Sequence, residues 1–197
     1  MGVLKIASEL VGEAQRLAQN VLTGAPQRRR HTAGVAARAQ ELAVTLDSAE
    51  DRDQLVAAAW LHDIGYARAL RASGFHPLDG ARHLLALGWP GPIVALVARH
   101  SDAASVAAVR GLSRELDAFP VIDGPVDDAL TYADQTVGPD GDSVTFGERL
   151  AEKLLRHGPG SPNATAHARR EPVLRAAICR VDARLGRLGR PSYALHG

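Results

Sequence analysis

The chain has 197 residues and a formal net charge of +1, with 23 basic against 22 acidic side chains. This balance gives no overall field that would attract a nucleic-acid polymer or an anionic membrane. One cysteine excludes an internal disulfide framework, and the longest apolar runs, near 55–61 and 92–98, are shorter than the roughly 20 residues of a membrane span. The N-terminus also lacks the basic and apolar segments of a secretory signal. We therefore expect a cytoplasmic protein with neither a membrane nor a nucleic-acid polymer as partner.

The first part of the chain predicts two amphipathic helices, and no segment shows the alternation typical of a strand. Apolar residues three or four positions apart indicate helices over residues 3–22 and about 27–46. In the second helix, His31 lies one turn before Val35 on the apolar stripe. We therefore expect His31 to point into the core.

A third helix is expected over about 49–64, because acidic residues suit its start and Gly65 suits its end. Its apolar stripe continues into His62, so the pattern delivers the His62-Asp63 pair to the last turn of a largely buried helix. Buried polar groups require partners, which must come from elsewhere in the chain.

Two further histidines are expected at helix ends. His76 precedes Pro77, which suits the first position of a helix that ends at Gly88. His100 ends a short apolar helix that starts at Pro92 and shares a face with its apolar residues. Both histidines are thus candidates for a site inside the fold.

The middle of the chain predicts two more helices and a turn. One helix is expected over about 103–116, and the next begins at 123–125, where the sequence reads Asp-Gly-Pro. Asp134 lies on the inner face of this second helix, and residues 138–143 are expected to form a turn. Asp134 is therefore predicted to be an inward carboxylate.

The C-terminal part predicts two helices. Thr145 and Glu148 have the spacing of a capping box at the start of a helix that runs to His157. Residues 158–165 are expected to form a loop, and the last helix is clearest over 172–188.

Three separated motifs resemble those of one known family. The run AAAWLHDIG over residues 57–65 resembles the signature of the HD phosphohydrolase superfamily. Arg28-x-x-His31-Thr32 and the Tyr-Ala-Asp that ends at Asp134 fit the same family in their order along the chain.

The resemblance implies an all-α, single-domain helical bundle over residues 1–197. Its core would span about 27–137, with the N-terminal helix 3–22 and C-terminal helices over about 145–188 packed on it.

The same resemblance implies a metal centre. The segment FHPLDGA over residues 75–81 is similar to the HPxxGA segment of binuclear members, and His100 lies where those members carry another histidine. Asp63, with two oxygens, would bridge the two ions. The implied metal ligands are His31, His62, Asp63 and Asp134 for the first ion, and Asp63, His76 and His100 for the second.

Histidine and aspartate ligands suit phosphate hydrolysis for a physical reason. Phosphate esters are anionic and repel a water nucleophile, whereas a divalent cation lowers the pKa of bound water and shields this charge. Imidazole and carboxylate together admit several metals, and we expect one or two ions, first Fe or Mn, with Zn, Co, Ni or Mg also compatible. No cysteine or serine lies in a recognisable activated setting.

Two arginines are candidates for contact with the substrate. Asp63 and Arg28 are expected to act in catalysis, and Arg28 lies one helical turn from His31. Arg28, with Arg68 as a second candidate, would bind phosphate oxygens through the planar guanidinium fork. Asp102, two residues after His100, is a candidate for proton transfer.

Each candidate also has an ordinary structural interpretation. The His62-Asp63 pair would suit a helix C-terminus beside an arginine, and Asp134 a buried salt bridge. The other histidines would suit a satisfied core position (His31), helix ends (His76, His100) or a surface position (His83). No function is assigned to His157, His167, His196 and Cys179.

The sequence therefore favours a metal-dependent phosphohydrolase that cleaves a phosphate ester or anhydride of a small phosphorylated molecule, a nucleotide or dinucleotide, by metal-activated hydroxide. The alternative is a non-catalytic HD-fold ligand-binding or regulatory module, which a damaged ligand set would have favoured. The chain departs from the HD-GYP cyclic dinucleotide phosphodiesterases, because residues 99–102 lack the second adjacent histidine and no Gly-Tyr-Pro follows. Mononuclear 5′-nucleotidases and binuclear dinucleotide hydrolases both stay open, as does the oligomeric state.

Overall fold

The computed structural model describes residues 2–192 and 194, with the backbone alone for residues 2–8. Within these residues the fold is all-α, as predicted, and the one β-type contact is an isolated bridge between Val137 and Ser143. The α-helices are α1 (Gly2–Val21), α2 (Pro26–Leu42), α3 (Ala49–Leu61), α4 (His76–Ala86), α5 (Gly91–Arg99), α6 (Ala103–Arg110), α7 (Ser113–Leu116), α8 (Pro125–Gln135), α9 (Phe146–His157) and α10 (Pro162–Arg187). Three short 3-10 helices accompany them: η1 (Ala43–Thr45), η2 (Ile64–Tyr66) and η3 (Arg68–Leu70). None of the described helices combines the length and the apolar character that crossing a membrane requires.

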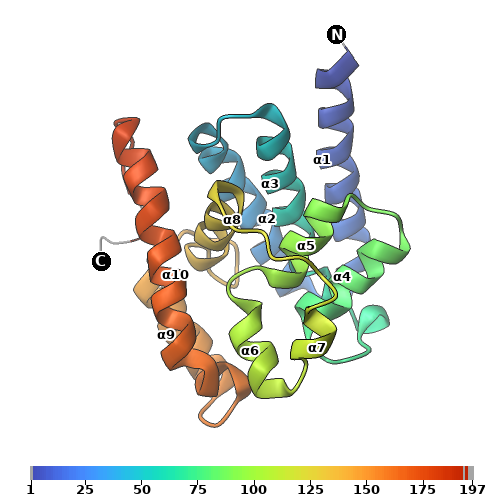
Figure 1. The fold of residues 1–197 in the computed structure, drawn as a ribbon, viewed down its shortest axis with the longest axis vertical. Coiled ribbons are helices and arrows are strands. Elements are labelled where there is room, and N and C mark those ends of the chain that lie inside the picture. Colours follow the sequence, from blue (N-terminus) through green and yellow to red (C-terminus); the bar gives the residue numbers. More distant parts are fainter. Residues whose placement is uncertain (1, 193, 195–197) are drawn as a thin grey trace.

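Helix α3 is the central element of the fold. Figure 1 shows α2, α3 and α8 in the middle of the molecule, with α10 on one side and α1 on the other. The apolar core forms two clusters, and α3 contributes to both: Leu55, Ala58 and Ala59 to one, Ala57 and Leu61 to the other. The three consecutive alanines of α3 are fully buried, since their small side chains let neighbouring helices approach from several sides. The chain therefore leaves α3 at Leu61 in the interior of the molecule.

The end of α3 differs from the prediction by a few residues. The helix stops at Leu61, His62 caps it, and the 3-10 turn η2 follows Asp63. Gly65 lies in this turn, where a Cβ would stand 2.0 Å from the carbonyl oxygen of His76. The glycine thus lets the turn pack directly against the start of α4.

Two expectations about the later helices are wrong. The single helix expected over 103–116 is broken at Gly111, whose φ of +71° ends α6 before α7 begins. The loop expected over 158–165 is helical from Pro162, because Ser161 caps α10 by accepting a hydrogen bond from the backbone of Ala164. Helix α10 continues through Pro172, ten residues after its start.

Helix α9 confirms the predicted capping box. The Thr145 hydroxyl accepts a hydrogen bond from the Glu148 backbone at 3.2 Å, and the Glu148 carboxylate accepts one from the Thr145 backbone at 2.8 Å. The cap fixes where α9 starts, and therefore which of its side chains face the rest of the molecule.

Candidate metal centre

Helix α2 carries His31 into the interior, where only 1% of the residue is exposed. Its Nδ1 lies 3.0 Å from the carbonyl oxygen of Gly138, which accepts only, so Nδ1 carries the proton. The turn that brings Gly138 there packs against Gly34, where a Cβ would stand 2.6 Å from the Gly141 oxygen. His31 Nε2 is therefore the acceptor nitrogen, and it lies 3.2 Å from Asp134 Oδ1, 3.8 Å from Asp63 Oδ2 and 3.2 Å from the Arg149 guanidinium.

His62 is the residue whose hydrogen bonding is incomplete. Its Nδ1 lies 2.8 Å from the carbonyl oxygen of Ala59 and is therefore the donor nitrogen. The opposite nitrogen, Nε2, is fully buried and has no hydrogen-bond partner. It lies 3.6 Å from Oδ1 of Asp63. A buried acceptor without a donor costs free energy unless a cation takes the lone pair.

His76 and His100 meet at the same point from α4 and from the residue after α5. His100 Nδ1 is 2.7 Å from the carbonyl oxygen of Val97, and its Nε2 is 3.3 Å from His76 Nε2. His76 Nε2 is also 3.2 Å from Oδ1 of Asp63. Burial lowers the pKa of His76, and burial with His62 and His76 nearby lowers the pKa of His100 to about 3. Both rings are therefore neutral near pH 7, the form that binds a metal.

Asp63 joins these histidines into two groups of possible ligands. His31, His62 and Asp63 form one group, and Asp63, His76 and His100 form the other, each with its donor atoms within 4.8 Å of one another. Burial opposes the ionisation of Asp63, but His62, Arg28 and His76 outweigh it and hold the pKa of Asp63 well below its usual range.

The donor set fits a divalent cation. Backbone carbonyls fix the tautomers of three histidine rings, His31, His62 and His100, so that their Nε2 atoms face the centre. This is how metal-binding histidines are normally oriented. Five of the six predicted ligands thus fall into two groups around one shared carboxylate, although ligation itself stays a prediction.

Asp134, the sixth predicted ligand, lies beside the groups. Its Oδ1 is 3.2 Å from His31 Nε2, while its Oδ2 is 3.1 Å from the Lys153 ammonium and accepts a hydrogen bond from Ser101 at 2.7 Å. Burial opposes its ionisation, but Lys153, His31 and Arg149 hold the pKa of Asp134 well below its usual range. Asp134 is therefore an ionised carboxylate that faces both His31 and the side chain of Lys153.

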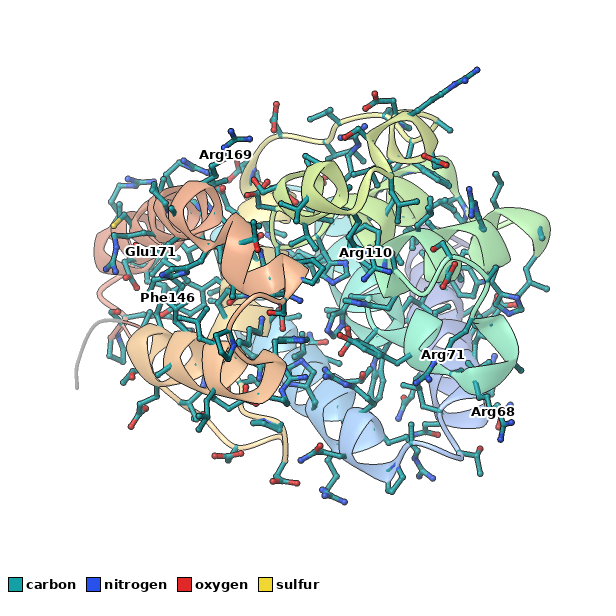
Figure 2. The ribbon with its side chains drawn as sticks, turned by 90° about the horizontal axis from the view of Figure 1, so that it is seen from below. Arg68, Arg71, Arg110, Phe146, Arg169 and Glu171 are labelled. Atoms are coloured by element: carbon teal, nitrogen blue, oxygen red, sulfur yellow. The ribbon has the colours of Figure 1, made fainter. Side chains whose placement is uncertain are left out.

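The two predicted substrate arginines lie in different places. Arg28 reaches Asp63 Oδ2 at 2.9 Å and lies 4.0 Å above the ring of Tyr66, in the cleft at the centre. Arg68 is exposed on η3, at the edge of the molecule in Figure 2, and does not line this cleft. The 3-10 turns after Asp63 carry Arg68 outward, so the structure does not bring it to the cleft with Arg28, and its role in substrate binding stays a prediction.

Asp102 is also displaced from its expected place. Its backbone is left-handed, with φ of +51°, and its side chain lines a separate cavity beside Asp123 and Asp127. Burial raises the pKa of Asp102. It is therefore not positioned for proton transfer at the metal centre.

The cleft is lined by several residues that the sequence did not single out. It has a volume of about 40 Å³ and opens beside a larger hollow of about 180 Å³, with which it shares His76 and His100. Helices α9 and α10 and the turn η2 supply the unforeseen lining residues: Tyr66, Arg149, Lys153, Arg156, His157, Asn163 and Arg170.

His157, to which no function was assigned, lines both cavities. The sequence did contain a signal for the basic side chains that α9 adds to the cleft, here called the cationic wall. Arg149, Lys153 and Arg156 recur at positions i, i+4 and i+7, which places three cations on one face of α9. His196, to which no function was assigned, lies outside the described residues.

Comparison with known proteins identifies the family. The model of the HD domain matches residues 28–138, more than half of the chain. The chain therefore belongs to the HD domain family, which includes metal-dependent phosphohydrolases. The search of curated proteins and the search of solved structures each gave no match. The matched residues end before α9, so the cationic wall lies outside the part that defines the family.

Proposed function

We propose that the protein is a metal-dependent phosphohydrolase that cleaves a phosphate ester or anhydride of a small phosphorylated molecule, with a nucleotide or dinucleotide as the expected class. The observation that carries the proposal is the buried Nε2 of His62, which has no partner and faces Asp63. One or two divalent ions, Fe or Mn by expectation, would supply a water of lowered pKa and neutralise phosphoryl oxygens.

The surrounding residues have distinct roles in this proposal. The first ion would be held by His31, His62 and Asp63, with Asp134 completing the set, and the second by Asp63, His76 and His100. Arg28 keeps one nitrogen on Asp63 and lines the cleft, where its other nitrogens can bind phosphoryl oxygens.

The cationic wall supports an anionic substrate. Lys153 and Arg149 line the same cleft as Arg28, and Arg149 contacts both His31 Nε2 and Asp134 Oδ1 there. A phosphorylated molecule entering the cleft would therefore meet positive charge on both sides.

Metal content tests the proposal. Protein purified without added metal, and then equilibrated with Mn²⁺, is expected to hold one or two divalent ions by elemental analysis. His62→Ala should lose most of this metal, whereas His83→Ala, a half-buried histidine of α4 outside the cleft, should keep it. Equal metal content in wild type and His62→Ala would contradict the proposed site.

A hydrolysis screen of nucleotides and dinucleotides completes the test. Turnover that is lost in His62→Ala and kept in His83→Ala supports the enzyme. Bound metal without turnover of any phosphorylated compound would leave the non-catalytic binding module as the better description.

A further inference from the structure

Arg170 is a partly buried arginine that has no acidic partner. Its Nε donates a hydrogen bond to the carbonyl oxygen of Ser101 at 2.8 Å, but it forms no ion pair with any residue that the structure describes. Other arginines in similar settings do have a carboxylate, as Arg28 has Asp63 and Arg184 has Asp128. Burial lowers the pKa of Arg170 despite the more distant Asp134 and Asp102. A desolvated guanidinium without a counter-charge is costly, and an anionic ligand would relieve this cost.

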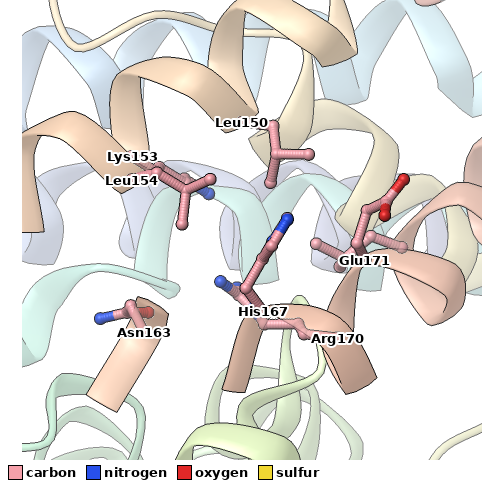
Figure 3. A pocket seen from close by; sticks show the side chains of 8 residues that line it. Leu150, Lys153, Leu154, Asn163, His167, Arg170 and Glu171 are labelled. Atoms are coloured by element: carbon pink, nitrogen blue, oxygen red, sulfur yellow. The ribbon is translucent and has the colours of Figure 1, made fainter. Parts of the chain in front are cut away.

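The position of Arg170 links the cavities around the metal centre. It lines the small cleft at the candidate ligands and also the larger hollow beside it. Figure 3 shows it on α10, together with Asn163, across from Lys153 on α9. Its anchor at Ser101 directly follows His100, and the Ser101 hydroxyl donates to Asp134. The guanidinium is therefore held at a fixed place next to the centre.

The cleft beside Arg170 has more basic than acidic side chains in its lining, and its two carboxylates, Asp63 and Asp134, both have basic partners. Glu152 is already paired with Arg149 and Arg156, so it leaves no free carboxylate for the cleft. Burial, together with Arg156, Arg28 and Lys153, lowers the pKa of His157, which lines the same cavities, to about 4. The first turn of α10, which carries Asn163, also lines both cavities and adds the positive end of a long helix.

The hollow has room for more than a single phosphate. Besides Arg170 it is lined by Phe75, Pro77, Ala103 and Val106, which offer an apolar surface to the organic part of a ligand. A single phosphoryl group at the metal centre would leave most of this hollow unused.

We propose that Arg170, together with Asn163, forms a second anion subsite that binds a second phosphate group of the substrate. The substrate class is then a compound with at least two phosphates, one at the metal centre and one at Arg170. The inference rests on the proposed function for the place of the first phosphate. The terminal nitrogens of Arg170 suit phosphate, because the planar fork binds two oxygens at once.

Calorimetric titration of the chelator-treated full chain with inorganic phosphate tests the subsite without any metal. Arg170→Met is expected to weaken phosphate binding roughly 10- to 100-fold, the loss of charge-assisted hydrogen bonds. Arg169→Met removes the same charge from the next residue, which is exposed and labelled in Figure 2, and should bind phosphate like the wild type. Equal binding by Arg170→Met and Arg169→Met would overturn the proposal.

Two further variants keep the test decisive if Arg170→Met does not fold. Arg170→Lys retains the charge but loses the fork, and Asn163→Ala leaves the charges unchanged. Each is expected to weaken phosphate binding several-fold. Phosphate binding like that of the wild type in both would equally overturn the proposal.

Kinetics then separate this subsite from the metal centre. In the Mn²⁺-loaded protein, Arg170→Met should raise the KM for ADP relative to that for AMP, with kcat less affected. An unchanged ratio of the two KM values would contradict a second phosphate at Arg170. Absence of metal or turnover, with phosphate binding still dependent on Arg170, would contradict the proposed function and leave the subsite standing.

Discussion

At the residue scale, the histidine rings of the centre differ in what holds them. Backbone carbonyls fix three of them, whereas His76 is stacked on the ring of Tyr66, with centroids 4.0 Å apart and planes 18° apart. Tyr66 also supports Arg28 through a cation–π contact. One aromatic ring thus positions both a predicted ligand and the arginine expected to bind the substrate.

Tyr66→Leu is therefore expected to weaken the second ion, the one assigned to His76 and His100. A supporting contact of this kind is worth roughly tenfold in metal affinity. Metal titration of the two sites checks this, with Tyr66→Phe as the control because it keeps the stacked ring. If Tyr66→Leu binds two ions as tightly as Tyr66→Phe, the stacking has no positioning role.

Gly65 gives a second prediction at this scale. Gly65→Ala would place a Cβ 2.0 Å from the backbone oxygen of His76, which must then move. We expect a loss of about 2–4 kcal/mol in the free energy of unfolding, measured by urea denaturation. Gly186→Ala, in α10 with no heavy atom within 4 Å, should instead stabilise by about 0.5–1 kcal/mol. Similar unfolding midpoints for the two variants would refute the close approach at Gly65.

The convergence of the histidines could be predicted from the sequence, but the environment of Asp134 could not. Inward stripes and family motifs indicated that His31, His62, His76 and His100 face one centre. The partners of Asp134, Lys153 and Arg149, come from a helix that follows a turn and lies beyond the recognised motifs. No local pattern relates two such distant segments.

At the scale of elements, the spacing of apolar residues identified the helix faces better than the helix ends. Apolar residues continue beyond Gly111 at Leu112 and Leu116, yet one positive φ angle divides the segment into α6 and α7. At α10 the helix extends beyond its expected range, because the apolar pattern is clearest over 172–188 while the helix already begins at Pro162. Ends depend on the backbone of single residues, which periodicity does not report.

The cap of α9 leads to a prediction for this element. Thr145→Ala removes the side chain that accepts the Glu148 backbone N–H, and should cost about 1 kcal/mol in the free energy of unfolding. Thr145→Ser keeps the oxygen and should retain most of this stability. Thermal or urea unfolding of both variants checks it, and equal stability of Thr145→Ala and Thr145→Ser would show that the cap is not needed.

At the scale of the whole molecule, helices from both ends of the chain close the structure around α3. Helix α1 packs on the cluster that includes α4 and α5, and α10 packs on the cluster that includes α2 and α8. The all-α architecture was predictable from the sequence. The single-domain organisation stays a prediction, as does the cytoplasmic location.

The raised pKa of Asp127 should make the free energy of unfolding depend on pH. Burial, with Asp128 and Asp123 nearby, raises the pKa of Asp127 to about 7. The unfolded chain ionises this carboxyl near its ordinary pKa of 3.8, so its contribution to stability is complete below that pH and is lost as the pH rises through about 7.

Asp127→Asn should remove this loss. Allowing for partial solvent exposure, the variant is expected to gain roughly 1–2 kcal/mol over the wild type between pH 4 and pH 8. Asp47→Asn, at an exposed position, serves as the control for removing a charge. Urea unfolding at several pH values measures the difference, and parallel pH profiles for wild type and Asp127→Asn would contradict the prediction.

The central claim is that imidazoles and carboxylates from distant helices surround a common cation. Anomalous diffraction at the manganese edge, from crystals of the wild-type protein grown with Mn²⁺, tests it most directly. We expect a peak within bonding distance of Nε2 of His31 and His62 and of the Asp63 carboxylate, with a second peak at Asp63, His76 and His100 if two ions bind. A centre without a peak, with His62 Nε2 bonded to water or protein instead, would contradict it.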